Sequence, residues 1–159
     1  MPFWKKAVIC IVTIEVLGNA SGLVTLFSLE GWYDSLKKPP GTPPTGTFGP
    51  VWLIIYAMMG LSLALLLSKE AQRSLKRRAL TWFVVQFCLN LSWTPAFFGL
   101  QRIDLALVII IPMLLAILMT IRSSWPVSKT AALLLLPYLL WVGYATYLNA
   151  GFLVLNPPG

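Results

Sequence analysis

Histidine is absent from this chain of 159 residues, and only 11% of the residues are charged. Without histidine the chain has no His-based catalytic triad, no histidine metal site and no histidine ligand for haem iron. Soluble domains carry roughly 25% charged residues, so the shortage of charge, together with 58% hydrophobic residues, indicates a lipid environment. Any chemistry must come from tryptophan, tyrosine, asparagine, glutamine or the five acidic residues.

Cysteine is also scarce, since only Cys10 and Cys88 are present and each lies inside an apolar run. Two isolated thiols support neither a disulfide framework nor a metal site, so we expect both to serve packing. The net charge is +7, but the basic residues form short clusters between apolar runs. That pattern is typical of a membrane protein and not of a nucleic-acid-binding protein, which needs a continuous basic face.

Five apolar stretches follow one another along the chain. They cover residues 7–27, 48–68, 79–100, 103–121 and 130–155. About 20 apolar residues span the hydrocarbon core as a helix, and the stretches lack the alternation of barrel strands. The sequence therefore predicts an all-α integral membrane bundle of five transmembrane helices, forming a single domain over residues 1–159. Because Glu15 interrupts the first stretch, we expect that stretch to be retained rather than cleaved as a signal peptide.

Lysine and arginine are divided unequally between the two sets of predicted loops. One set, with the N-terminus, holds nine: Lys5, Lys6, Lys69, Arg73, Lys76, Arg77, Arg78, Arg122 and Lys129. The other set holds three: Lys37, Lys38 and Arg102. By the positive-inside rule, this difference predicts a cytoplasmic N-terminus and a C-terminus on the opposite side.

The segment "GWYDSLKKPPGTPPTGTFGPVW" interrupts the apolar pattern between the first two stretches. Its prolines and glycines predict that residues 39–50 have no regular structure. Since proline fixes φ, such a loop loses little entropy on ordering, and we predict that residues 28–47 form a stiff lid over the helix ends. The alternative for Trp32 and Tyr33 is an interfacial aromatic belt.

Three of the predicted helices carry aromatic side chains at helical spacing. The stripes are Trp52, Tyr56 and Met59; Trp82, Gln86, Asn90, Trp93 and Phe97; and Tyr138, Trp141, Ala145, Leu148 and Phe152, with Tyr144 and Asn149 beside the last. Such stripes usually pack a core, but an amide at membrane depth is costly without a partner. Gln86, Asn90 and Asn149 should therefore face the interior, where the stripes predict an apolar pocket with a few polar groups.

Small residues and one acid stand out in the remaining apolar stretches. Gly18 and Gly22 form a GxxxG pattern, which suits close helix packing or dimerisation. The third predicted helix has a small-residue edge made of Ser92, Ala96 and Gly99. We expect Glu15 to be neutral and hydrogen-bonded to a neighbouring helix, or else to belong to a proton or ligand path.

Three motifs in combination resemble the TspO/MBR translocator protein family, also called tryptophan-rich sensory proteins. They are "WYDSLKKP…PP…F…VW…Y" (residues 32–56), "LNLSWTPAFFG" (89–99) and "LLPYLLWVGYATYLN" (135–149). The resemblance covers nearly the whole chain. It implies a five-helix membrane protein, often a homodimer, whose first loop caps a pocket. Members of this family bind porphyrins such as protoporphyrin and haem, benzodiazepine-type ligands and, in animals, cholesterol.

The resemblance also assigns roles to single positions. Trp52 and Trp141 match the family's pocket tryptophans, which in some bacterial members are tied to light-dependent porphyrin breakdown. Tyr33, Asn90, Tyr138 and Ala145 match further pocket-lining positions. Similar proteins carry a tryptophan after Lys-Pro in the loop, whereas this chain reads "KPPG" and has Gly41 there. The cholesterol motif is absent, because no basic residue follows Tyr147.

Together these observations predict a binding site and three possible functions. The expected ligand-binding residues are Tyr33, Trp52, Tyr56, Gln86, Asn90, Trp93, Tyr138, Trp141 and Ala145, with Trp52 and Trp141 as the candidates for catalysis. No obligatory cofactor or metal is expected, and porphyrin or haem is the expected ligand. The protein is then a tetrapyrrole receptor, sensor or carrier, an enzyme that degrades porphyrin in light, or a transporter of amphiphiles.

The expected partners are the lipid bilayer, a tetrapyrrole or other hydrophobic small molecule, and a second copy of the chain. We expect that copy to bind through the third helix, at Ser92, Ala96 and Gly99, and we expect no nucleic acid. The loop charges suit a bacterial plasma membrane, and a eukaryotic member would lie in the mitochondrial outer membrane.

Overall fold

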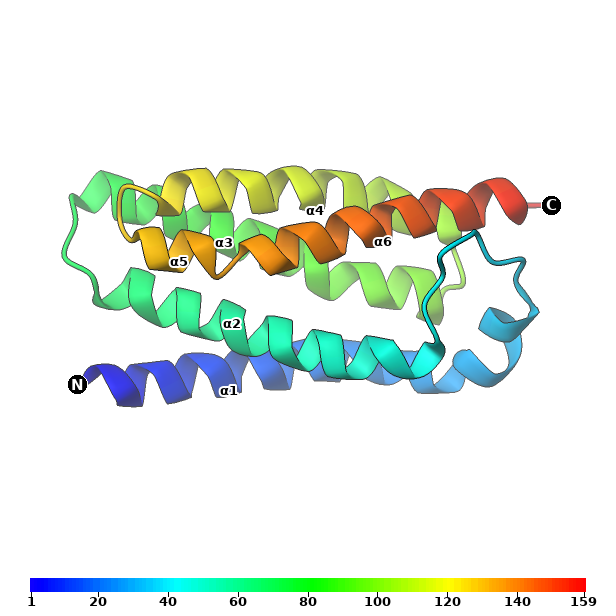
Figure 1. Cartoon of the computed structure of the whole chain (residues 1–159), viewed down its shortest axis with the longest axis horizontal. Coiled ribbons are helices and arrows are strands. Elements are labelled where there is room, and N and C mark those ends of the chain that lie inside the picture. The colour runs from blue at the N-terminus through cyan, green and yellow to red at the C-terminus, as the bar shows by residue number, and fades with distance from the viewer.

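The computed structural model describes all residues, Met1–Gly159, and every regular element in it is helical (Figure 1). The helices are α1 (Phe3–Gly22), α2 (Phe48–Ser68), α3 (Arg73–Thr94), α4 (Ile103–Ser124), α5 (Lys129–Leu133) and α6 (Leu136–Leu155). Short 3-10 turns cover Leu23–Phe27 and Thr45–Thr47, and π-helical turns cover Leu29–Tyr33 and Pro95–Gly99.

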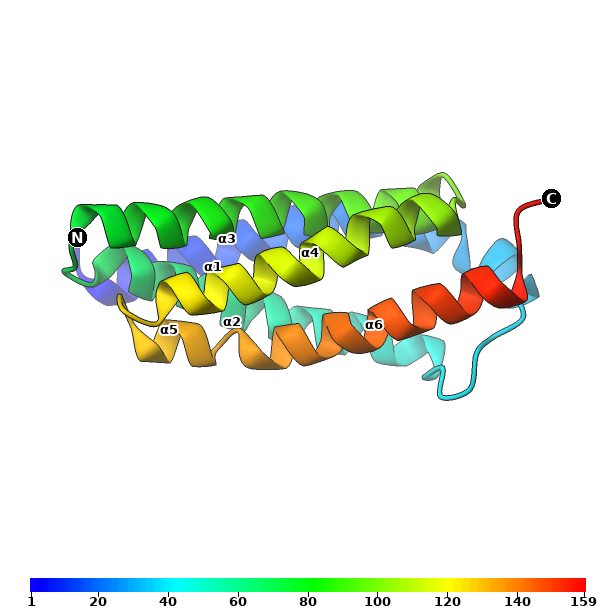
Figure 2. The same ribbon diagram turned by 90° about the horizontal axis from the view of Figure 1, so that it is seen from above.

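Successive long helices run in opposite directions, and each extends along the bundle from one end towards the other (Figures 1 and 2). α1 packs mainly on α2, α3 on α4, and α4 also on α6. The N-terminus lies at one end of the bundle, with the α2–α3 and α4–α5 connections, and the C-terminus lies at the other end. Residues 34–44 cross the bundle at this second end, so the predicted loop and the C-terminal part of α6 are neighbours.

Four helical segments are long and apolar enough to cross a membrane: Phe3–Phe27, Thr45–Ser68, Ile103–Ser124 and Lys129–Leu155. This finding identifies a membrane protein with apolar helices. α3 is not among the four, and its first six residues include Arg73, Lys76, Arg77 and Arg78.

The predicted helix bounds are confirmed for α2, and the structure corrects the others. The first predicted helix, 7–27, begins earlier at Phe3, and its last five residues form a 3-10 turn. The third, 79–100, begins at Arg73 and changes to a π-helical turn at Pro95. The fourth, 103–121, continues to Ser124. Hydropathy marks the part of a helix that suits lipid, whereas hydrogen bonding extends the helix into polar sequence.

The fifth predicted helix, 130–155, is two helices in the structure. α5 ends at Leu133, and α6 begins at Leu136, one residue before Pro137. Proline has no N–H to donate to the carbonyl four residues earlier, and its ring clashes with that carbonyl. The carbonyl four residues before Pro137 belongs to Leu133, so the break falls where this bond is missing.

The prediction that residues 39–50 lack regular structure was wrong at its C-terminal end. A 3-10 turn covers Thr45–Thr47, and α2 already includes Gly49 and Pro50 in its first turn. Proline is tolerated there because the first N–H groups of a helix have no partner within the helix.

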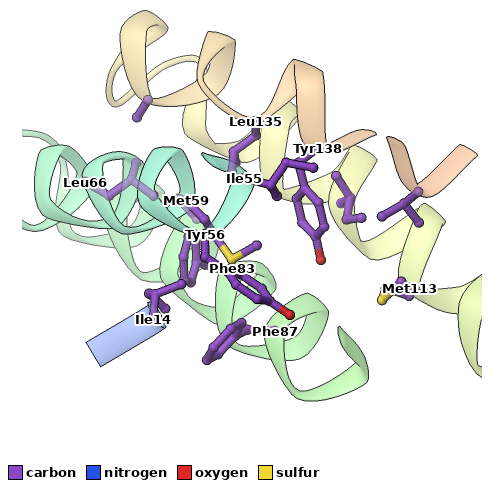
Figure 3. Packing of buried hydrophobic residues seen from close by; sticks show 14 of the residues in the cluster. Ile14, Ile55, Tyr56, Met59, Leu66, Phe83, Phe87, Met113, Leu135 and Tyr138 are labelled. Atoms are coloured by element: carbon purple, nitrogen blue, oxygen red, sulfur yellow. The ribbon is translucent and has the colours of Figure 1, made fainter. Parts of the chain in front are cut away.

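The core brings α1, α2, α3, α4 and α6 together, as the buried side chains in Figure 3 show. α1 and α2 approach closely at Gly60, where a Cβ atom would lie 2.5 Å from the Cα atom of Ile11. A second close approach lies at Gly18, whose Cβ would be 2.4 Å from the ring of Tyr56. Two glycines on opposite helices therefore set the spacing of this pair.

Candidate ligand-binding pocket

A cavity of about 350 Å³ lies between the C-terminal part of α1, α2, the end of α3 and α6. Most of its lining is apolar, and its aromatic residues are Tyr33, Phe48, Trp52, Tyr56, Trp93, Phe97, Phe98, Trp141, Tyr144 and Phe152. A concave apolar space of this size, with a few polar groups, is the usual form of a small-molecule site.

The aromatic walls are held by ring-to-ring contacts. Trp52 stacks on Tyr56 with a centroid distance of 5.2 Å and an interplanar angle of 28°. Trp93 stacks in the same way on Phe97, at 5.2 Å and 25°. On the α6 side, Trp141 meets Phe48 edge-on at 6.1 Å. Because each tryptophan has an aromatic neighbour, the walls present flat indole surfaces in fixed positions.

One amide in the pocket wall is fully engaged in hydrogen bonds. The indole Nε1 of Trp93 donates to Asn149 Oδ1 at 2.9 Å, and Asn149 Nδ2 donates to the Ile103 carbonyl at 3.0 Å. Asn149 is 1% exposed, so these bonds satisfy its buried polar atoms. Asn149 therefore orients the Trp93 ring and ties α3 and α6 to the start of α4.

Behind the pocket wall, four polar side chains form one continuous hydrogen-bonded chain. The Tyr56 hydroxyl donates to Asn90 Oδ1 at 3.0 Å, and Asn90 Nδ2 donates to the Tyr138 hydroxyl at 3.0 Å. The Tyr138 hydroxyl donates to Gln86 Oε1 at 2.8 Å, and Gln86 Nε2 lies 3.8 Å from Met59 Sδ. This Tyr56–Gln86 chain joins α2, α3 and α6, and only Tyr56 reaches the cavity.

Tyr33 differs from the other polar residues of the pocket, because its hydroxyl has no hydrogen-bond partner in the protein although the residue is 2% exposed. The ring is held by Phe98 and Phe152, each with a centroid distance of 5.5 Å. Burial, then the nearby Asp34 carboxylate and the Tyr144 phenol, raise the pKa of Tyr33 to about 12. A buried hydroxyl without a partner is available to a polar group of a ligand.

Replacing Tyr33 with phenylalanine should stabilise the ligand-free protein by about 1 kcal/mol, because it removes an unpartnered buried hydroxyl. In the wild type, a raised folded-state pKa makes stability fall as pH rises from the unfolded value near 10 towards 12. Tyr33→Phe should make that fall shallower. Unfolding in detergent micelles, followed by tryptophan fluorescence across this pH range, measures both effects.

A matched control is Tyr147→Phe, because the Tyr147 hydroxyl does donate, to the Pro40 carbonyl at 2.9 Å. This variant should lose stability rather than gain it. Equal losses in the two variants would contradict the account of Tyr33.

The pocket is open on one side. Its exposed lining residues are Asn19, Leu23 and Leu26 from the end of α1 and the following 3-10 turn, and Thr45 and Gly49 at the start of α2. The deeper lining residues on α3 and α6 are buried or partly buried. These exposed residues come from the C-terminal part of the first apolar segment and the start of the second, so the opening lies between the neighbouring ends of these two segments.

The structure brings six of the nine predicted binding residues to the cavity. These are Tyr33, Trp52, Tyr56, Trp93, Trp141 and Ala145. Gln86, Asn90 and Tyr138 do not reach it and instead form the chain behind Tyr56. Phe48 and the α1 residues lining the opening were missed, because α1 carries no aromatic stripe and Phe48 lies at a helix start.

Glu15 and the small-residue edge of the third predicted helix have different surroundings from those expected. Glu15 accepts from Asn19 Nδ2 at 2.8 Å on its own helix, so the expected bond to a neighbouring helix was wrong. Of the small-residue edge, Ala96 is buried within the chain, Gly99 faces Val24, and only Ser92 and Gly99 are exposed. The part of this edge that a second copy of the chain could contact is therefore smaller than the sequence indicated. Dimerisation through this edge remains a prediction.

Comparison with known proteins gives a consistent likeness over almost the whole chain. A model of the TspO/MBR family matches residues 9–155. "Tryptophan-rich protein TspO" from Chlorobaculum tepidum is 38% identical over 149 residues, which cover 94% of each chain. "Protein CrtK" from Rhodobacter capsulatus is 35% identical over 132 residues, 83% of this chain and 82% of that protein. Human "Translocator protein" is 37% identical over 120 residues, 74% and 70% of the two chains.

Proposed function

This chain belongs to the TspO/MBR family, and on that premise we propose that it is a membrane receptor or carrier for tetrapyrroles and similar flat hydrophobic ligands. The observation that carries the proposal is the cavity walled by Trp52, Trp93 and Trp141, three indoles from three helices. A flat macrocycle gains offset stacking on indole faces beyond the burial of its own apolar area.

We propose that the chain crosses the bilayer five times as one domain over residues 1–159, with α3 as the fifth span. From Ala79 to Gly99 the α3 segment and its π-helical turn carry no charge. At 1.5 Å per residue this length covers about 30 Å, the thickness of the hydrocarbon core. α3 also lies alongside α4 over the length of the bundle (Figure 2).

The nine-to-three division of basic residues supports a cytoplasmic N-terminus. The chain ends and connections that carry the nine lie together at one end of the bundle (Figure 1). We propose a bacterial plasma membrane as the location, and the mitochondrial outer membrane for a eukaryotic source.

We propose that residues 28–47 act as the lid of the pocket. Leu29, Tyr33 and Thr45 of this segment line the cavity. Its middle is fastened to α6, because the Tyr144 and Tyr147 hydroxyls donate to the carbonyls of Gly41 and Pro40. Lys37 exchanges two hydrogen bonds with the Asn156 side chain, both at 2.9 Å.

The polar end of a tetrapyrrole has partners at this lid. Lys38 Nζ lies 5.1 Å from the centre of the Tyr33 ring and 3.5 Å from Asp34 Oδ1, and Tyr33, whose hydroxyl has no partner, lines the cavity. We propose that these groups bind the propionates while the indoles bind the macrocycle. Haem iron would receive no imidazole from this chain, which contains no histidine.

Titration with protoporphyrin IX, followed by quenching of tryptophan fluorescence, tests the proposal. Trp52→Ala and Trp141→Ala should each weaken binding by about 10- to 100-fold, because each removes a stacking face and buried apolar area. Trp4→Ala is the matched control, since Trp4 is 62% exposed and lies at the other end of α1. Binding that survives both pocket variants, or that falls equally in the control, would contradict the proposal.

The alternative of light-dependent porphyrin degradation is favoured by one contact, the stacking of Trp52 on Tyr56. Electron transfer from this pair to a photoexcited ligand would use adjacent rings. Illuminating the complex while following the Soret band separates the functions. Bleaching no faster than that of free porphyrin supports binding alone, whereas accelerated bleaching that Trp52→Phe slows supports the enzyme. Absence of quenching would remove both and favour transport of another amphiphile.

A further inference from the structure

The first turns of α3 hold a concentration of unpaired positive charge. Arg73, Lys76, Arg77 and Arg78 lie within six residues, and Glu70 is the one acid between residues 63 and 103. The two ion pairs of the chain, Lys38–Asp34 and Arg102–Asp104, lie elsewhere. The charge on α3 is therefore not compensated within the protein.

The four cations are not equivalent. Lys76 Nζ donates to the carbonyls of Leu67 and Lys69 at 2.7 and 3.2 Å, and so caps the end of α2. Arg73 and Arg77 are exposed and make no side-chain hydrogen bond. Their guanidinium groups are free to bind a partner outside the chain.

Arg73 and Arg77 lie on a face of α3 that continues along the helix with a polar residue and then with apolar residues. Ala79, Phe83 and Phe87 form the buried face of α3. On the opposite face, Arg73, Arg77, Thr81 and Val84 follow one another at spacings of four, four and three residues. Two shallow hollows lie along this line, and Arg73, Arg77 and Thr81 border both of them. One hollow continues to Val84 and Val85, which are 59% and 38% exposed.

We propose that this face of α3 binds an anionic phospholipid, with the phosphate held by Arg73 and Arg77 and an acyl chain along Val84 and Val85. Two guanidinium groups one helical turn apart match the oxygens of a phosphate, and Thr81 adds a hydroxyl donor. The first turn of α3 has no capping side chain, so its N–H groups and the helix dipole also favour an anion. This proposal depends on membrane insertion and not on the tetrapyrrole site.

The succession of charged and then apolar residues along this face of α3 favours a lipid over a free anion. The cations lie at the end of the bundle that carries nine of the twelve basic residues (Figure 2). The valines lie about two to three turns further along α3, towards the middle of the bundle. A headgroup and its acyl chain follow the same order through a leaflet, and basic residues near the membrane surface attract anionic lipid.

Native mass spectrometry of the protein released from mixed micelles of phosphatidylglycerol and phosphatidylcholine tests the proposal. The wild type should retain phosphatidylglycerol selectively, and Arg73→Gln with Arg77→Gln should lower that selectivity by about 30-fold, because each arginine loses its charge-assisted hydrogen bonds to the phosphate. The matched control is Lys5→Gln with Lys6→Gln, which removes the same charge at the same end and should keep most of the selectivity. An unchanged unfolding transition in phosphatidylcholine micelles verifies that the arginine variant is folded.

Three results would overturn the proposal. The first is an equal loss of selectivity in the Lys5 and Lys6 variant, which would mean that overall charge and not this face retains the lipid. The second is displacement of phosphatidylglycerol by inorganic phosphate at the same concentration, which would mean a site for free anions. The third is unaltered retention of the lipid in Val84→Gln with Val85→Gln, which should weaken it by removing the apolar surface along the acyl chain.

Discussion

Gly60→Ala is expected to lower the free energy of unfolding by about 3 kcal/mol, a large effect for the addition of one methyl group. The new Cβ would lie 2.5 Å from Ile11 Cα, 2.8 Å from Ile11 N and 3.0 Å from the Cys10 carbonyl oxygen. All three are backbone atoms of α1, so no side-chain rotation can relieve the contact. α1 must move away from α2, and the packing of Gly18 against Tyr56 weakens with it.

The measurement is denaturant unfolding in detergent micelles, with Gly143→Ala as the matched control. Gly143 is also inside a helix, but a Cβ there meets nothing within 4 Å. Alanine has the higher helix propensity, so this control should gain about 0.5 to 1 kcal/mol. If the two variants shifted stability in the same direction, helix propensity rather than the contact of α1 with α2 would be the cause.

Asn90→Leu is expected to destabilise the protein by about 2 to 3 kcal/mol. Asn90 is 4% exposed and is the central member of the Tyr56–Gln86 chain. Leucine keeps the volume but leaves the Tyr56 hydroxyl without an acceptor and removes the donor to Tyr138. Ser92→Ala, at an exposed position of the same helix, should change stability little.

The double variant Asn90→Leu with Tyr56→Phe separates the lost bond from lost packing. If the orphaned Tyr56 hydroxyl carries most of the cost, the double variant should be more stable than Asn90→Leu alone. Strictly additive losses would show that the hydrogen-bonded chain is not a unit. Tyr56→Phe also keeps the ring that stacks on Trp52, so porphyrin binding in this variant reports on the pocket wall separately.

Helical periodicity predicted several of the aromatic side chains that line the cavity. Trp52 and Tyr56 were predicted to share a face of α2, and they stack on each other in the cavity. Trp93 and Trp141 were likewise expected to point inwards, and both line it. The resemblance to the TspO/MBR family is confirmed by the comparisons. These features follow from residue type and spacing on one helix, which the sequence displays directly.

Features that depend on two helices at once were not predictable. Gln86, Asn90 and Tyr138 were expected in the pocket, but they satisfy one another across α3 and α6, and the identity of those partners depends on helix rotation. No sequence pattern singles out Gly60, because the need for glycine there arises from its close contact with the backbone of Ile11 on another helix.

The pocket opening between the neighbouring ends of the first two apolar segments would connect affinity to the bilayer. A molecule that entered there from the membrane would first dissolve in the hydrocarbon phase, so its occupancy would follow its mole fraction in lipid and not its aqueous concentration. Two compounds with identical contacts would differ in apparent affinity by the ratio of their partition coefficients. Adding empty vesicles at constant total compound would dilute it and empty the protein, although nothing in the protein had changed.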